Sequence, residues 1–212
     1  MKYRMYTELM EQPGSLKRTL KAEGDRMSQI SNEIADCRRI YLVGCGSSLS
    51  TCYSARDAVA MNYELNIDVM TGYEFYYHRK IEERDSVVIF TSQSGETADT
   101  LAALRRATEL GLKTVTITNE PESTMASESQ STIITRCGRE EAILGTKTYM
   151  TQLLALYRIL FDMHTDELSE RILSELDELP DEIGRLLSDT EDDCRGLAEE
   201  HAGEDIFYCM GS

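Results

Sequence analysis

The feature that most constrains the fold of this chain is a regular alternation of short apolar runs with helix-like segments. The runs are rich in β-branched and other apolar side chains, as is typical of buried strands, and they cover residues 39–44, 67–70, 86–90, 113–118 and 131–135. Strands that alternate with helices predict an α/β fold, a parallel sheet covered by helices on both faces. In such sheets, ligands bind at the carboxyl ends of the strands, near a switch point in the strand order.

Apolar residues at helical spacing predict the helices, at residues 15–36, 51–63, 97–110, 123–127 and 147–163. We therefore divide this part of the chain into an N-terminal helical segment, residues 1–36, and an α/β domain, residues 37–163.

The remainder of the chain is acidic and then apolar. Residues 164–204 place leucines and isoleucines at helical spacing among many acids, and we expect Pro180 to divide this stretch into two or three amphipathic helices. Self-association as a coiled coil is the alternative. Residues 205–212 have the pattern of a strand entering a glycine turn, much like residues 39–45. We interpret them as the first strand of a truncated second domain; an edge strand that completes the first sheet is the alternative.

Composition excludes several functional classes. The formal net charge of −16 disfavours nucleic acid as a partner, because its backbone requires a basic patch. No apolar run is long enough to span a membrane, and the N-terminus lacks the pattern of a signal peptide, so we expect a cytoplasmic protein. The six cysteines include no CxxC pair and are expected to be buried free thiols. We therefore expect neither a metal nor another cofactor.

The loop at residues 44–48 follows the first predicted strand and precedes a helix. Gly44 and Gly46 would let the backbone turn tightly and approach a ligand, and Ser47 and Ser48 could cap the helix or donate hydroxyl groups to an anion. By itself the loop is weak evidence, because it has neither the spacing of a dinucleotide fingerprint nor that of a P-loop.

A second loop, Ser92-Gln93-Ser94-Gly95-Glu96-Thr97, lies in the same position after another strand. It offers hydroxyl groups, an amide and backbone N–H groups at the positive end of a helix, a combination that suits a phosphate monoester. The alternative is a well-capped helix, with Thr97 and Glu96 in or near its first turn. Two such loops at one edge of the predicted sheet favour a binding site.

A third segment, residues 138–148, precedes the last helix of the domain. Its Glu141 could act as an acid, a base or an acceptor for a sugar hydroxyl, and we treat it as a supporting catalytic candidate. A surface acid in a loop is the competing interpretation.

These motifs together resemble the sugar isomerase (SIS) domain family. The run from Val43 to Ser48, the run Thr91-Ser92-Gln93-Ser94-Gly95-Glu96-Thr97-Ala98-Asp99-Thr100, and the stretch from Glu141 to Lys147 occur in that family's order. The resemblance covers residues 5–163 well and is greatest to the isomerase module of glucosamine-6-phosphate synthase and to related deaminases and isomerases.

The resemblance implies a five-stranded parallel sheet in a three-layer αβα sandwich and a homodimer. It also implies that a phosphorylated sugar contacts Ser48, Ser92, Gln93, Ser94 and Thr97, with Gly44, Gly46 and Gly95 shaping the loops. Residues 143–145, including Ile143 and Gly145, would line the sugar. Here the chain departs from the family's Val-Ala-Ser-Thr-Lys: Ile143-Leu144-Gly145-Thr146-Lys147 lacks one hydroxyl group.

The sequence is compatible with two classes of function. In the family the acid/base glutamate, a histidine and a C-terminal lysine lie in a second SIS domain, to which no residue of this chain can be matched. We therefore expect the N-terminal half of an aldose–ketose isomerase, or of an amino-sugar phosphate isomerase or deaminase, that takes a ligand like fructose 6-phosphate or glucosamine 6-phosphate. The alternative is a non-catalytic module for sugar-phosphate sensing or assembly.

Overall fold

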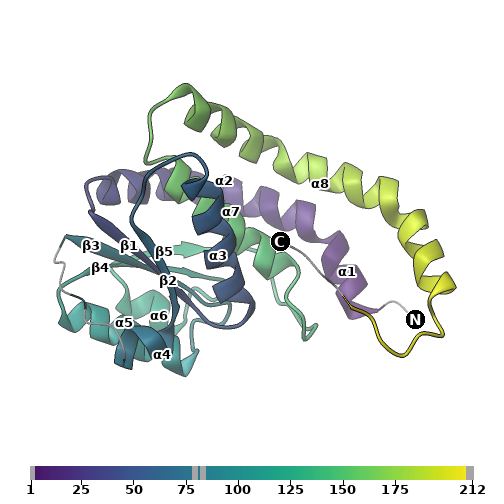
Figure 1. Ribbon diagram of the computed structural model, residues 1–212, viewed down its shortest axis with the longest axis horizontal. Helices are drawn as coiled ribbons and strands as arrows, with labels where there is room; N and C mark the ends of the chain where they lie inside the picture. Colours follow the sequence, from purple (N-terminus) through teal and green to yellow (C-terminus); the bar gives the residue numbers. More distant parts are fainter. Residues whose placement is uncertain (1–2, 78–80, 82–84, 209–212) are drawn as a thin grey trace.

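The computed structural model describes residues 3–77, 81 and 85–208, and a five-stranded, all-parallel sheet forms its centre (Figure 1). The strands follow the spatial order β2-β1-β3-β4-β5. Their bounds are β1 (Arg39–Gly44), β2 (Ile67–Thr71), β3 (Ser86–Thr91), β4 (Lys113–Thr118) and β5 (Ser131–Ile134). Each strand lies at a predicted apolar run, and the predicted α/β fold is confirmed.

Side-chain alternation along the strands produces two separate cores. In β1, Ile40 and Leu42 belong to one buried cluster and Tyr41 and Val43 to the other, because successive side chains of a strand point to opposite faces. One face is covered by α2 (Gln12–Ile34), α3 (Ser47–Ala60) and α7 (Lys147–Phe161), and the other by α4 (Gly72–Tyr77), α5 (Ala98–Glu109) and α6 (Thr124–Glu128). The result is the expected three-layer sandwich (Figure 1).

The N-terminal segment holds two helices, α1 (Arg4–Met10) and α2, where the sequence predicted one beginning at residue 15. Helix α2 begins earlier because Pro13 lies in its first turn, where proline needs no hydrogen-bond donor. Its residues Met27, Ile30 and Ile34 are buried in the core beneath the sheet. Helix α2 therefore belongs to the same packed body as the α/β domain.

The acidic C-terminal stretch is one helix, α8 (Glu167–Glu200), so the prediction that Pro180 divides it was wrong. A proline inside a helix lacks one N–H donor and costs about 3 kcal/mol. Here Leu176, Pro180 and Ile183 are buried, and two of them cluster with Leu16 of α2 and Leu154 of α7. We attribute the continuity of α8 to this packing, which lies outside the α2–α7 layer (Figure 1).

Residues 205–208, after α8, have no regular secondary structure. Ile206, Phe207 and Tyr208 are exposed and do not join the five-stranded sheet. Residues 209–212 of the predicted final strand lie outside the described residues, so the strand at 205–212 remains a prediction.

Candidate functional site

The strand order places a switch point between β1 and β3. The chain passes from β1 into α3 on one face of the sheet and from β3 into α5 on the other. The two connections diverge at the carboxyl edge, and open α/β sheets bind their ligands at such a crevice. Loops 44–48 and 92–97 follow these two strands and therefore both lie at the switch point.

Thr91, at the end of β3, fastens the first loop to the sheet. Its hydroxyl donates to the carbonyl oxygen of Ser48 at 3.1 Å and lies 3.2 Å from Sγ of Cys52. A Cβ atom on Gly44 would lie 2.7 Å from the same hydroxyl, so this approach requires glycine. Burial raises the pKa of the Cys52 thiol to about 12, which keeps it protonated and unsuited to act as a nucleophile.

The second loop is folded on itself by its own hydroxyl groups. Ser92 is buried, and its Oγ accepts a hydrogen bond from the Gly95 N–H at 3.1 Å and lies 3.0 Å from Oγ1 of Thr97. Gly95 has a φ of +64°, and a Cβ atom there would lie 2.2 Å from Oγ of Ser123. Both the backbone conformation and the lack of space therefore require glycine at this position.

The helices that follow these two loops begin without a side-chain cap. The N-cap residue of α3 is Gly46, which has no side chain to cap the helix. The N-cap residue of α5 is Thr97, whose side chain makes no capping hydrogen bond. The alternative of a well-capped helix is therefore wrong for Thr97, whose hydroxyl group pairs with Ser92 instead. The first N–H groups of a helix carry partial positive charge, so two helix ends at this edge can receive an anion.

The remaining predicted ligands of the second loop differ in their surroundings. Ser94 Oγ accepts a hydrogen bond from the Glu96 N–H at 3.2 Å. Gln93 is partly buried, and its carbonyl oxygen accepts from the Asn119 N–H at 3.1 Å and from Oγ1 of Thr118 at 3.2 Å. The main chain of the loop is thus anchored to the end of β4.

Glu140, which the sequence analysis did not single out, closes the N-terminus of α7. Its Oε1 accepts from the N–H groups of Thr146 at 2.7 Å and Lys147 at 2.9 Å, and its Oε2 from the hydroxyl of Thr148. A carboxylate in this position is stabilised by the positive end of the helix. A glutamate a few residues before a helix start is the signal that could have indicated this role.

The predicted site residues of the third segment differ in how close they lie to the other two loops. Glu141 is exposed and pairs with Arg4 at 3.1 Å and Arg139 at 3.5 Å. Ile143 is 101% exposed and so packs against neither of the other loops. Gly145 lies beside the first loop, since a Cβ atom on it would be 3.4 Å from Oγ of Ser47.

The N-terminal helices support this third segment, a role that the sequence did not predict. Glu8 is buried and accepts hydrogen bonds from the N–H groups of Glu141 at 2.5 Å and Ala142 at 3.1 Å. Lys147 has a side chain only 3% exposed, and its Nζ donates to Oε2 of Glu11 at 2.6 Å. Carboxylates from α1 and the α1–α2 junction therefore hold both ends of the segment.

Asn119, directly after β4, joins the second loop to the start of the third segment. Besides its N–H bond to Gln93, its Nδ2 donates to the carbonyl oxygen of Gly138 at 3.0 Å, and its Oδ1 accepts from the Cys137 N–H at 3.1 Å. The side chain is buried, so these bonds are shielded from water.

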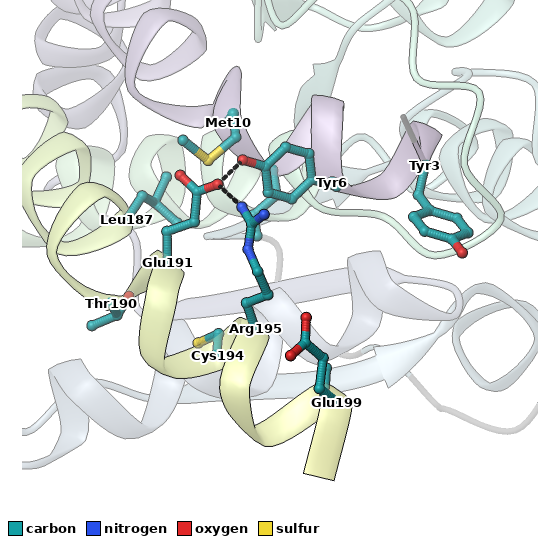
Figure 2. A pocket seen from close by; sticks show the side chains of 11 residues that line it. Tyr3, Tyr6, Met10, Leu187, Thr190, Glu191, Cys194, Arg195 and Glu199 are labelled. Atoms are coloured by element: carbon teal, nitrogen blue, oxygen red, sulfur yellow. Dashed lines mark hydrogen bonds and ion pairs between the residues drawn. The ribbon is translucent and has the colours of Figure 1, made fainter. Parts of the chain in front are cut away.

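A hollow of about 750 Å³ lies elsewhere, between α1 and the last turns of α8 (Figure 2). Glu191 lies on its wall and accepts from the hydroxyl of Tyr6 at 2.5 Å and from Arg195 at 2.8 Å. The hydrogen bond to Glu191 raises the pKa of Tyr6. The lining is largely apolar and includes no residue of the three loops, so we do not assign the site to this hollow.

Two kinds of feature are absent from the described part of the chain. No three His, Cys, Asp or Glu side chains gather there as a metal ion would require, and no helix there has the length and apolar character of a membrane span. The five described cysteines are free thiols, but Cys45 and Cys194 are exposed, so the expectation of burial was wrong for these two.

The family model and the most similar curated proteins that we compared point to the same family. The model of the SIS domain family matches residues 33–161. The chain is 34% identical over 207 residues to a glutamine–fructose-6-phosphate aminotransferase (isomerizing) of Methanothermobacter thermautotrophicus, covering 98% of this chain and 34% of that protein. The protein of the same name from Caldanaerobacter subterraneus is 32% identical over 219 residues, covering 96% and 36%.

The fold comparison agrees. The structure matches the C-terminal domain of glucosamine-fructose-6-phosphate aminotransferase from Francisella tularensis with a TM-score of 0.81 at 27% identity, covering 97% of this chain and 61% of that one. The chain spans about a third of the length of the curated relatives that it matches. Because the family model covers more than half of the chain, and a relative 34% identical covers nearly all of it, the chain belongs to the SIS domain family.

Proposed function

We propose that this chain binds the phosphate group of a phosphorylated sugar at the switch point between β1 and β3. The observation that carries the proposal is the meeting of two helix N-termini without side-chain caps, at α3 and α5, with a cluster of serine and threonine hydroxyls. Such an arrangement supplies hydrogen-bond donors and positive partial charge to a dianion without a lysine or a metal ion.

The residues divide into three roles in this proposal. Ser92, Ser94 and Thr97 donate to the phosphate oxygens, together with the N–H groups at the start of α5. Ser48 and Gln93 complete the cradle, and Gly44, Gly46 and Gly95 shape its backbone. The stretch at residues 143–145 faces the sugar, with Gly145 beside Ser47 and the exposed Ile143 able to close over a ligand.

The reaction that we propose is a proton transfer between adjacent sugar carbons, in which this chain supplies the phosphate-holding half of a sugar-phosphate isomerase or an amino-sugar phosphate isomerase or deaminase. The names of its relatives, aminotransferases described as isomerizing, support this chemistry. Glu141 keeps a supporting role at most, because its carboxylate pairs with Arg4 and Arg139. Glu140 acts as a positioning residue, since α7 occupies its oxygens.

Three further proposals concern the whole protein. We propose that residues 205–212 begin a second SIS unit, which the exposure of Ile206, Phe207 and Tyr208 supports. We also propose that the protein is a homodimer and that it works in the cytoplasm. Sedimentation velocity of the purified chain tests the dimer directly.

Calorimetric titration with fructose 6-phosphate and glucosamine 6-phosphate tests the central proposal. We expect saturable binding of at least one ligand, and no binding of unphosphorylated fructose at the same concentration. Ser92→Ala should weaken the affinity by about 10- to 100-fold, because it removes a hydrogen bond to a charged group worth about 1.5–3 kcal/mol.

Ser86→Ala is the matched control for this variant. Ser86 is also buried, begins β3, the strand that Ser92 follows, and has an Oγ without a hydrogen-bond partner among the described residues. Absence of binding by both sugar phosphates, or equal affinities of wild type and Ser92→Ala, would overturn the proposal. The alternative is a non-catalytic sensing or assembly module. It is supported by Glu140, whose carboxylate is used in hydrogen bonds to the start of α7. Sugar-phosphate binding without turnover, in a protein that includes the second unit, would favour this alternative.

A further inference from the structure

Arg18, on the exposed side of α2, differs from the other arginines that the structure describes. Each of the others has a carboxylate oxygen within 4.0 Å, as the abundance of acids in a chain of net charge −16 would lead one to expect. Arg18 has none in the described part of the chain: its hydrogen bonds go to two neutral acceptors, the carbonyl oxygen of Arg136 and Oγ of Ser15. Its full positive charge is therefore uncompensated by a direct partner.

These two bonds fix the guanidinium group in a definite place. Nε donates to the Arg136 carbonyl at 3.2 Å and Nη2 to Ser15 at 3.1 Å. The remaining nitrogen, Nη1, lies over Gly14, where a Cβ atom would approach it to 3.2 Å. A guanidinium group held in this way loses little further freedom when it binds an oxyanion.

Two hollows, of about 570 Å³ and 520 Å³, adjoin this group, and both are lined by Arg18, Gly138 and Arg139. The side chain of Arg139 is 86% exposed, and its contact with Glu141 is long, at 3.5 Å. Of the acids on the walls, Glu11 is paired with Lys147, whereas Glu120, in the smaller hollow, accepts a hydrogen bond from the neutral amide of Asn119 and keeps its charge. The hollows thus combine a fixed and a movable arginine with room for more than a single ion.

We propose that Arg18 and Arg139 bind the phosphate group of a small organic phosphate at a second site, in the hollows between α2 and the loop that follows β5. Arginine is suited to this task because its fork of N–H donors matches the geometry of a phosphate. No residue of loops 44–48 or 92–97 lines either hollow, so the site is separate from the one at the switch point. Asn119 connects the two sites, since it bonds to both Gln93 and Gly138.

Titration of the ¹⁵N-labelled chain with inorganic phosphate at low ionic strength, followed by amide chemical shifts, tests the proposal. We expect saturable shifts at Gly138 and Arg139 that are distinct from those at Gly95. Arg18→Gln should weaken the affinity measured at Gly138 by about tenfold or more and leave that at Gly95 unchanged. Ser92→Ala should do the reverse, so failure of this proposal and failure of the switch-point site give different results.

Two more variants complete the test. Arg139→Gln alters a side chain with little burial and should also weaken phosphate binding, which keeps the proposal testable if Arg18→Gln unfolds. Arg185→Gln, on α8, removes an exposed arginine paired with Glu182 and should change nothing. Absence of saturable shifts at Gly138 and Arg139, or shifts that persist unchanged in both Arg18→Gln and Arg139→Gln, would refute the second site.

Discussion

The N-termini of α5 and α7 lie at the same carboxyl edge of the sheet, yet one is open and the other is closed. At α7 the carboxylate of Glu140 accepts the first N–H groups of the helix. At α5 the N-cap residue Thr97 makes no capping hydrogen bond. The chain therefore supplies its own anion where a loop must be held, and leaves a helix end without a side-chain cap where we propose that an external anion binds.

Substitution of Gly95 should produce the largest effect, because it alters the open end itself. Gly95→Ala places a residue with a Cβ atom in a left-handed backbone conformation and brings that atom against Ser123. We expect the free energy of unfolding to fall by more than about 2 kcal/mol, and sugar-phosphate affinity to fall by more than that of Ser92→Ala. Denaturant unfolding and calorimetry measure the two effects.

Gly111→Ala is the control for the conformational part of this loss. Gly111 has a φ of +73°, but a Cβ atom there meets no atom of the described residues within 4 Å, so its substitution should cost only about 1–2 kcal/mol and leave ligand binding intact. Equal losses of stability in the two variants would show that the contact with Ser123 has no importance.

Substitution of Glu140 should have the next largest effect and tests the closed end. Glu140→Gln removes the charge from the hydrogen bonds to Thr146 and Lys147, and we expect the free energy of unfolding to fall by about 2 kcal/mol. Glu141→Gln, next to it in the chain, breaks only exposed ion pairs and should cost less than about 1 kcal/mol. Denaturant unfolding of both variants shows which of the two acids stabilises the start of α7. A larger loss of unfolding free energy in Glu141→Gln than in Glu140→Gln would reverse our assignment.

The smallest effect should come from a third helix end, that of α8. Asp166 accepts hydrogen bonds from the Ser169 N–H at 2.8 Å and from the Tyr63 hydroxyl at 2.7 Å, and these bonds, the first being the stronger cause, lower the pKa of Asp166 below its ordinary value of 3.8. A lowered pKa favours the charged form in the folded state. Its contribution to stability is therefore complete above pH 3.8 and is lost as the pH falls through the lower value.

The comparison of wild type with Asp166→Asn tests this sign. The advantage of the wild type in thermal unfolding should be constant near neutral pH and should shrink as the pH falls below 3.8. His164 nearby also has a pKa lowered by burial, so both proteins lose stability as the pH falls below 6.5. Because the charge of Asp166 raises the pKa of His164, the difference between the two proteins above pH 3.8 includes this pair, and only the change below pH 3.8 reports on the protonation of Asp166. A difference that grows as the pH falls below 3.8 would contradict the assignment.

Local patterns were sufficient for much of the fold. The apolar runs predicted all five strands because strands covered by helices on both faces are rich in apolar and β-branched residues, whichever partners they meet. The glycine- and serine-rich loops were identified for a similar reason, since left-handed turns and short hydroxyl side chains are properties of the segment itself. By the same local reasoning Pro180 should have ended a helix, and packing on α2 and α7 overruled it.

By itself, then, the sequence determined a parallel α/β sheet and the two loops at its switch point, because both follow from the conformations that short segments prefer. Only the tertiary structure decided which acid closes α7, that Glu8 and Glu11 brace the third segment, and that Arg18 faces two hollows with no carboxylate partner among residues 3–77, 81 and 85–208. These features depend on residues far apart in the chain, such as Glu8 and Glu141. Hydrogen-bond geometry across such a separation is set by the packing of whole helices, which no local pattern specifies.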